Sequence, residues 1–185
     1  MVVAAAGNNN DNADNFFPAS YNHVISVGAT NSNDTKAGFS NYGTKIDVMA
    51  PDVSIRSTTV WGVTPPVSGY ASWDGTSMAS PVVAGIVGLM LSANSNLNPD
   101  AVETCLKQTC DNINSLNPNY IGLIGAGRVN AYQAVSCVIP SVLPIASFNY
   151  QTIDVCGGEV QFTNTSQNLQ TTWTWDFGNG QTSNL

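Results

Sequence analysis

The sequence predicts an α/β domain followed by the first part of a second, all-β domain. Three observations support this prediction. Short apolar runs typical of buried strands alternate with polar loops in residues 1–58, strongly apolar helical segments follow, and alternating polar and apolar residues begin near residue 145. The chain has 185 residues, 43% of them hydrophobic, which suffices for one complete core and part of another.

The first part of the chain contains the predicted strands. Each is a short apolar run closed by Gly, Asn or Pro, as expected for a buried strand. Residues 61–74 are rich in Gly and Pro and are expected to be irregular. The predicted strands are Met1–Ala6, Val24–Ala29, Ile46–Ala50 and Ser54–Thr58.

One helix dominates the prediction. Ser77–Ala93 is apolar on every face, so we expect it to be buried on all sides. Pro81 lies near its first turn, where the missing N–H is tolerated. Two further helices are expected, one after Asn98-Pro99-Asp100 to about residue 109 and one over Gly127–Cys137.

The composition changes after Cys137. Residues 138–144 contain two prolines and are expected to be a linker between a domain at 1–137 and another at 145–185. Strands are predicted at 146–150, 160–164 and 171–176, and in the last of these Trp173 and Trp175 share one face. Three strands are too few for an independent all-β domain, so we expect this domain to be incomplete.

The charge of the chain argues against several classes of partner. Lys and Arg number 5 and Asp and Glu 12, giving a net charge of −7. Nucleic-acid binding requires clustered Lys and Arg, and an anionic membrane surface repels such a chain. The longest apolar stretch, Val82 to Leu91, has about half the length of a membrane span. We expect neither a nucleic-acid partner nor a membrane span.

The composition also favours a secreted protein. Only 9% of the residues are charged, 22 are asparagine, and the four cysteines lack the CxxC spacing of a zinc site. Cys105 and Cys110 would point apart on one helix, so either could pair with Cys137, leaving Cys156 over. Four unpaired thiols are the alternative.

Chemistry is most clearly indicated at Gly75-Thr76-Ser77. Ser77 is placed at the start of the apolar helix, where backbone N–H groups and the helix dipole favour negative charge. Such a site stabilises both an alkoxide and the oxyanion that forms when it attacks a carbonyl. An ordinary serine N-cap is the alternative that the residue pattern leaves open.

Four segments in order resemble the subtilisin-like serine proteases, with a spacing closest to the proteinase K branch. The resemblance covers residues 1–137 and departs from the usual motif at Val82, where the family has His. It implies the C-terminal part of a parallel-sheet catalytic domain. The four segments are Ala4–Asn10, Phe17–Ala29, Phe39–Pro51 and Gly75–Gly85.

The resemblance implies a role for each matching residue. Ser77 would be the nucleophile of a serine endopeptidase acting on protein or peptide substrates. The Asn8 side chain and the Ser77 backbone N–H would donate to the oxyanion. Substrate would be bound by Ala5, Ala6, Gly7, Gly75 and Thr76, the first three forming one wall of the P1 pocket.

The chain departs from the family because it lacks a histidine at the position of the catalytic general base. The triad Asp and His precede Asn8 in the family, and the single histidine here, His23, falls in a non-catalytic segment. We therefore expect a fragment that is inactive alone. The alternatives are a non-catalytic, subtilase-like binding or adhesion protein, and a structural surface protein.

The family also implies a structural calcium ion. Its ligands would be the Asp47 carboxylate and the backbone carbonyls of Asn22 and Val24, an all-oxygen set that suits Ca²⁺. The same resemblance suggests a cis peptide bond between Phe17 and Pro18.

The last segment resembles a PKD domain, an immunoglobulin-like β-sandwich. Residues 175–180 read Trp-Asp-Phe-Gly-Asn-Gly, with Asn179 where the family has Asp. The resemblance implies an accessory module that contacts proteins or polysaccharide.

Overall fold

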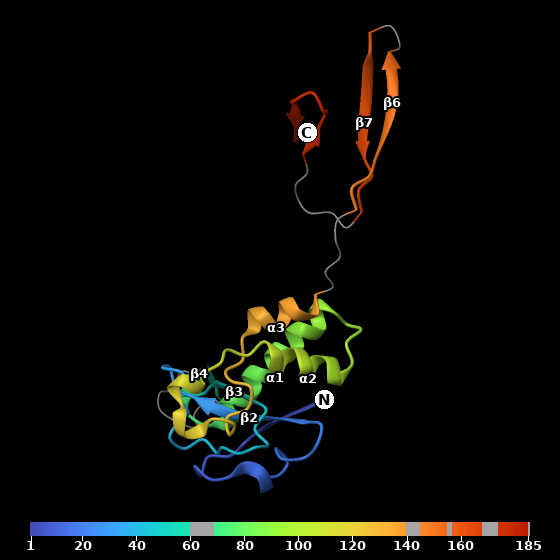
Figure 1. The fold of residues 1–185 in the computed structure, drawn as a ribbon. Helices are drawn as coiled ribbons and strands as arrows, with labels where there is room; N and C mark the ends of the chain where they lie inside the picture. Colours follow the sequence, from blue (N-terminus) through green and yellow to red (C-terminus); the bar gives the residue numbers. More distant parts are fainter. Residues whose placement is uncertain (60–68, 140–144, 155–156, 168–173, 185) are drawn as a thin grey trace. The chain divides into compact units, whose positions relative to one another are not determined.

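The computed structural model describes residues 1–59, 69–139, 145–154, 157–167 and 174–184. The chain divides into two units, Met1–Ile139 and Pro140–Leu185 (Figure 1). The first unit contains β1 (Val2–Ala5), β2 (Val24–Thr30), β3 (Val48–Pro51), β4 (Ile55–Thr58), β5 (Tyr70–Trp73), α1 (Thr76–Ala93), α2 (Pro99–Gln108), α3 (Ala131–Val138) and three short 3-10 turns at Ala13–Asn15, Asn114–Leu116 and Pro118–Tyr120.

A parallel sheet of β1, β2 and β3, in that order, forms the centre of the first unit. Val2 lies opposite Val24, and Val27 lies opposite Val48. Parallel strands are covered on both faces, which explains why these segments are continuous apolar runs instead of alternating ones. The α/β class and the parallel sheet are confirmed.

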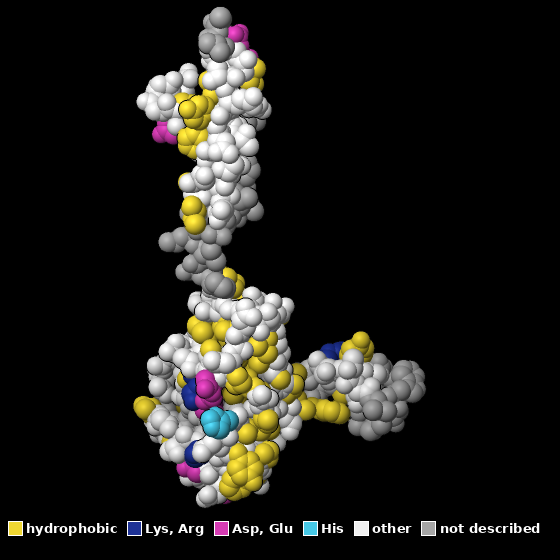
Figure 2. Space-filling model, turned by 90° about the vertical axis from the view of Figure 1, so that its right-hand side faces the viewer, with side chains coloured by type: hydrophobic (Ala, Val, Ile, Leu, Met, Phe, Trp, Pro, Cys, Tyr) yellow, Lys and Arg dark blue, Asp and Glu magenta, His cyan; other side chains and the backbone are white. Residues whose placement is uncertain are grey.

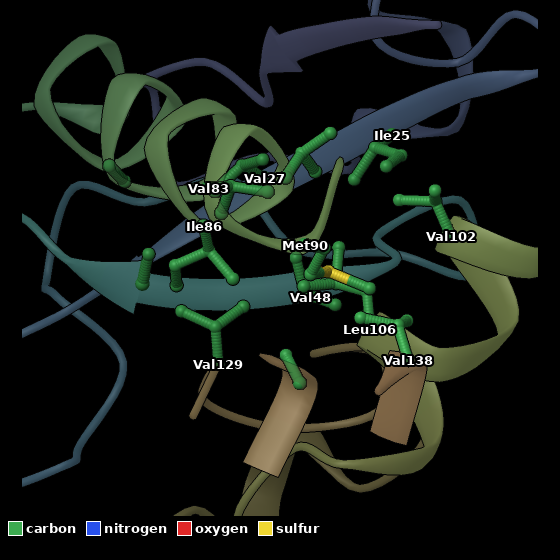
Figure 3. Packing of buried hydrophobic residues seen from close by; sticks show 14 residues of the cluster. Ile25, Val27, Val48, Val83, Ile86, Met90, Val102, Leu106, Val129 and Val138 are labelled. Atoms are coloured by element: carbon green, nitrogen blue, oxygen red, sulfur yellow. The ribbon is translucent and has the colours of Figure 1, made fainter. Parts of the chain in front are cut away.

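The two faces of β3 belong to different hydrophobic clusters. Val48 and Ala50 pack with Val83 and Met90 of α1 (Figure 3). Met49, which points the other way, packs in a second cluster with Ala6, Ile46, Ile113 and Ile124. The sheet is therefore buried on both sides at β3.

The three helices lie together on one side of the strands (Figure 1). α1 packs on β1, β2 and β3, and α3 packs on both α1 and α2. A disulfide joins Cys105 of α2 to Cys137 of α3, while Cys110 remains a free thiol. This resolves the choice between Cys105 and Cys110; Cys156 lies outside the described residues.

α1 is not buried on all sides, so that expectation was wrong. Thr76, Ala79, Val83, Ile86, Val87 and Met90 are its buried residues. Ala84, Gly85, Gly88 and Leu89 are exposed, because the described elements pack against only one face of the helix. By length and composition α1 meets the criterion for a membrane span, but core helices meet it too, and α1 packs on the sheet.

A second expectation was wrong near β5. Residues 61–74 were expected to be irregular, yet Tyr70–Trp73 forms an antiparallel pair with β4, with Ile55 opposite Trp73. The backbone groups of this segment are satisfied by a partner strand, which its Gly- and Pro-rich composition did not indicate. The cis peptide bond between Phe17 and Pro18 is present.

The second unit contains two antiparallel pairs, β6 (Phe148–Asp154) with β7 (Glu159–Asn164) and β8 (Trp175–Asp176) with β9 (Thr182–Ser183). The Phe162 ring lies 5.9 Å from that of Phe148, 5.8 Å from Trp175 and 6.1 Å from Phe177, centre to centre. Trp173, which was predicted to share one face of a strand with Trp175, lies outside the described residues.

Candidate active site

Ser77 lies at the amino end of α1, one residue after its start. Gly75 is the N-cap residue, and its φ of 138° favours glycine. Thr76 is buried, whereas Ser77 is exposed. The first N–H groups of a helix have no partner inside it and carry a partial positive charge. The Ser77 hydroxyl is therefore presented to solvent beside groups that stabilise an anion.

Thr76 connects Asn8 to the start of this helix. The Asn8 Oδ1 atom accepts hydrogen bonds from the Thr76 backbone N–H and from the Thr76 hydroxyl, both at 2.9 Å. The same hydroxyl accepts from Gly7 N at 3.1 Å. With Oδ1 held by two donors, the orientation of the Asn8 amide is determined, and its Nδ2 group is left as the donor. Nδ2 lies near Gly75, where an added Cβ would be only 3.2 Å from it.

A buried asparagine holds the loop that carries Asn8. Asn41 is 1% exposed. Its Nδ2 donates to Ala6 O at 2.9 Å, and its Oδ1 accepts from Asn9 N at 2.9 Å and from Asp11 N at 3.1 Å. The sequence placed Asn41 in a family-like segment but gave it no role, because side-chain bonds across 30 or more residues leave no local pattern.

The predicted substrate-binding residues lie close together. Ala6 is held to β2 by a bond from its N–H to Val27 O at 2.9 Å, and Gly7 contacts Thr76 as described. A side chain at Gly7 would clash with Asn41 and would lie 2.9 Å from the Phe16 ring. Ala6, Gly7, Gly75 and Thr76 are buried, so a substrate would meet their backbone more than their side chains.

His23 lies at the opposite end of the sheet from Asn8. It precedes β2, whereas Asn8 follows the carboxyl end of the parallel neighbour β1. At about 3.3 Å per residue, β2 separates the two ends by roughly 20 Å. His23 therefore does not reach Ser77, and as expected it is no base for this serine.

The predicted calcium ligands surround one hollow. Asn22, Val24 and Asp47 all line a cavity of about 680 Å³, at whose face Figure 2 shows the histidine beside acidic and basic side chains. The Asp47 carboxylate accepts from Ser26 N through Oδ2 and from Lys107 Nζ through Oδ1, both at 2.8 Å. The oxygens suit a hard cation, and an ammonium group already contacts one of them.

Lys107 is charged in this position. Its burial opposes the charged form, but the hydrogen bonds and charges of Asp47 and Glu103 outweigh that effect and raise the pKa of Lys107. In the part of the chain that the structure describes, no three His, Cys, Asp or Glu side chains form a group that could hold a metal.

A second carboxyl group lies behind the active-site loop. Asp52 is fully buried, and neither of its side-chain oxygens accepts a well-formed hydrogen bond from the residues that the structure describes. Burial raises the pKa of Asp52 to about 6; the Gly75 N–H opposes this rise and the charge of Asp74 adds to it. The sequence analysis missed Asp52, although a carboxylate directly after the buried strand β3 was a signal that could have found it.

The first unit is similar to known proteases. A family model described as the subtilase family, peptidase S8, matches residues 1–131. An extracellular protease of Xanthomonas campestris pv. campestris is 51% identical over 140 residues, which are 75% of this chain and 24% of that protein. Thermitase of Thermoactinomyces vulgaris is 42% identical over 135 residues, which are 73% of this chain and 44% of thermitase.

A solved structure supports the same relationship. A protease of Pseudoalteromonas arctica superposes with a TM-score of 0.66 and is 36% identical, covering 75% of this chain and 43% of that one. The chain thus spans less than half the length of these relatives. Since the family model matches well over half of the residues, the chain belongs to the subtilase family of serine proteases.

Proposed function

We propose that this chain is part of a secreted serine endopeptidase that hydrolyses peptide bonds in proteins through an acyl-enzyme. The observation that carries the proposal is the pair of hydrogen bonds from Thr76 to Asn8, which fixes an amide donor beside the exposed Ser77. The Xanthomonas relative is an extracellular protease, which supports the location outside the cell. The motif spacing supports a relationship with the proteinase K branch.

The first chemical step uses Ser77 as the nucleophile. Its Oγ attacks the peptide carbonyl carbon and gives up its proton to a base, while the carbonyl π electrons move to the oxygen. Asn8 Nδ2 and the Ser77 N–H donate hydrogen bonds to that oxyanion. The C–N bond then breaks, the amine leaves with a proton, and water hydrolyses the ester. Ala5, Ala6 and Gly7, with Gly75 and Thr76, would border the P1 side chain.

The base comes from outside this chain in our proposal. His23 is its single histidine and lies at the other end of β2. The relatives are more than twice as long as the matching segment, which leaves room for an Asp and a His of the triad elsewhere in the protein.

Two accessory features complete the proposal. Subtilases commonly bind structural calcium, and here Asp47 with the backbone carbonyls of Asn22 and Val24 would hold it, where it would supply only stability. The second unit would be the beginning of a PKD-like module that contacts proteins or polysaccharide. Its support is the Trp-Asp-Phe-Gly-Asn-Gly segment and the aromatic cluster around Phe162.

The test uses the product of the whole reading frame that contains this chain. A fluorophosphonate probe should label it covalently, and Ser77→Ala should abolish the labelling. Ser80→Ala, a serine one turn further along α1, is the matched control and should keep it. Asn8→Ala should keep some labelling but lower kcat about 10²–10³-fold, the range for loss of one oxyanion donor in subtilisin, a member of this family.

One result would contradict the peptidase proposal. A folded full-length protein that no probe labels at Ser77, and that cleaves no peptide, would contradict the peptidase and favour the non-catalytic binding protein. Unchanged kcat/KM in Asn8→Ala would refute the role of Asn8 alone.

A further inference from the structure

A lysine from α2 contacts the one carboxylate among the family-like calcium ligands. Lys107 Nζ is 2.8 Å from Asp47 Oδ1 and 3.2 Å from Glu103 Oε1. The Asp47 side chain is only 18% exposed, and its second oxygen accepts from the Ser26 backbone at 2.8 Å. Both oxygens of the carboxylate therefore have partners, one of them a positive charge supplied by the chain itself.

The surroundings favour a positive charge at this point. Asp47, Asp100 and Glu103 line the same hollow, with Lys45 as the basic residue among the lining side chains. The hollow borders the Asn22–Val24 segment, in which His23 has a φ of 64°. The Lys107 ammonium group thus joins α2 to the loop before β3 and neutralises the Asp47 carboxylate without a metal.

An ammonium group and a divalent cation repel each other when they share one carboxylate. Calcium needs several oxygens within about 2.3–2.6 Å, so it binds Asp47 either against the positive charge of Lys107 or after displacing Lys107 from Oδ1. Displacement gives up the ion pair, and the displaced charge stays nearby because α2 is fixed by its disulfide to α3. Both effects weaken the binding of calcium.

We propose that Lys107 is a built-in competitor of calcium, which holds Asp47 in the metal-free protein and lowers the calcium affinity of this site. The proposal rests on the calcium site of the proposed function but not on the peptidase activity. It predicts that calcium binds only weakly at this site in the natural protein and that loss of the Lys107 charge strengthens the binding.

The test measures calcium binding and melting temperature in the full-length protein. Lys107→Gln should bind calcium about tenfold more tightly by titration calorimetry and should gain a larger rise in melting temperature between chelator and 1 mM Ca²⁺, a concentration of about the order at which extracellular sites bind. Lys45→Gln removes the same charge from the same hollow without touching Asp47 and should show no such gain.

A third variant locates the effect. Adding Asp47→Asn to Lys107→Gln should abolish the gain, while calcium sites elsewhere in the protein stay unchanged. Lys107→Met, which keeps the aliphatic stem, serves if the glutamine variant does not fold. Equal calcium binding in wild type and in both Lys107 variants would overturn the proposal, as would a gain that survives Asp47→Asn. Fluorophosphonate labelling of Ser77, recorded on the same samples, reports separately on the peptidase proposal.

Discussion

At the scale of single residues, buried amides and carboxyls organise the active-site region. Thr76 fixes the Asn8 amide, Asn41 fixes the loop around it, and Asp52 lies unpaired behind Gly75. Each is a polar group removed from water, so its partners matter more than its mere presence.

We predict that Asn41→Ala disturbs catalysis as well as stability. The substitution removes three hydrogen bonds and leaves buried backbone groups unpaired, which should cost about 1 to 3 kcal/mol in the free energy of unfolding. In the full-length enzyme kcat should fall more than KM rises, because Asn8 loses its support. Urea unfolding and peptide hydrolysis measure the two effects.

Asn31 provides the control for this prediction. Its side chain also makes three hydrogen bonds, to Asn33 and Thr35, but in a loop after β2 that does not carry Asn8. Asn31→Ala should lower stability and leave kcat unchanged. Equal losses of kcat in the two variants would show that Asn41 acts only on stability.

The second residue-scale prediction concerns pH. The pKa of Asp52 is raised from 3.8 to about 6 in the folded protein, so folding favours its neutral form. Its contribution to stability is therefore fully present below about pH 4 and is lost as the pH rises through about 6. Asp52→Asn cannot ionise, so its stability relative to wild type should improve between pH 4 and pH 8, by on the order of 2 to 3 kcal/mol.

Urea unfolding of both proteins across this pH range checks the prediction. Asp74→Asn, at an exposed position, removes the charge that adds to the raised pKa of Asp52 and should show the same trend weakly. If the difference between Asp52→Asn and wild type stays constant with pH, Asp52 does not titrate in this range.

At the scale of elements, the sequence predicted what local composition encodes. The continuous apolar runs of β1, β2 and β3 were evident, and the helix predicted from Ser77 begins one residue earlier, at Thr76. β5 was not, since its residues become a strand only by pairing with β4. The exposed face of α1 was missed for the same reason: periodicity reports which faces are apolar and not how many neighbours are present to cover them.

The candidate site likewise contains residues that local sequence indicates and residues that only the fold brings together. Ser77 and Asn8 lie within motifs and could be named from the sequence. Asn41 and Lys107 bind partners far along the sequence, and no pattern near them indicates those partners. Asp52 was missed although it directly follows a buried strand, and its raised pKa depends on burial, which only the fold shows. Which of Cys105 and Cys110 pairs with Cys137 likewise required the packing of α2 on α3.

The disulfide gives a prediction at this scale. It closes a loop of 32 residues in sequence between two terminal helices, so Cys105→Ser should lower the free energy of unfolding by about 3 to 4 kcal/mol in the chain-entropy model. Cys110→Ser, at a free and partly buried thiol, should cost much less. Thermal unfolding and non-reducing peptide mapping test both statements; a mapped Cys110–Cys137 peptide would contradict the pairing.

At the scale of the whole molecule, the two units contribute differently. The first unit contains both hydrophobic clusters and every residue assigned to the active site. Among the described residues of the second unit, the strands are largely exposed and an aromatic cluster packs beside them. Stability should therefore reside mainly in residues 1–139.

The 185-residue chain by itself should not cleave peptides. A serine hydroxyl has negligible alkoxide at neutral pH without a base, and His23 is remote from Ser77. Hydrolysis of a chromogenic peptide by the chain should equal that of its Ser77→Ala variant. Turnover at ordinary protease rates that depends on Ser77 would mean that this chain supplies a base which we have not identified.

The uncovered face of α1 has a consequence for the behaviour of the chain in solution. Leu89 and Leu91 are 56% and 39% exposed beside glycine and alanine, a surface that water wets poorly. What keeps such molecules apart is their net charge of −7, and dissolved ions weaken that repulsion. Light scattering from the purified chain should therefore increase with ionic strength, because the molecules associate. At low ionic strength the chain should not aggregate.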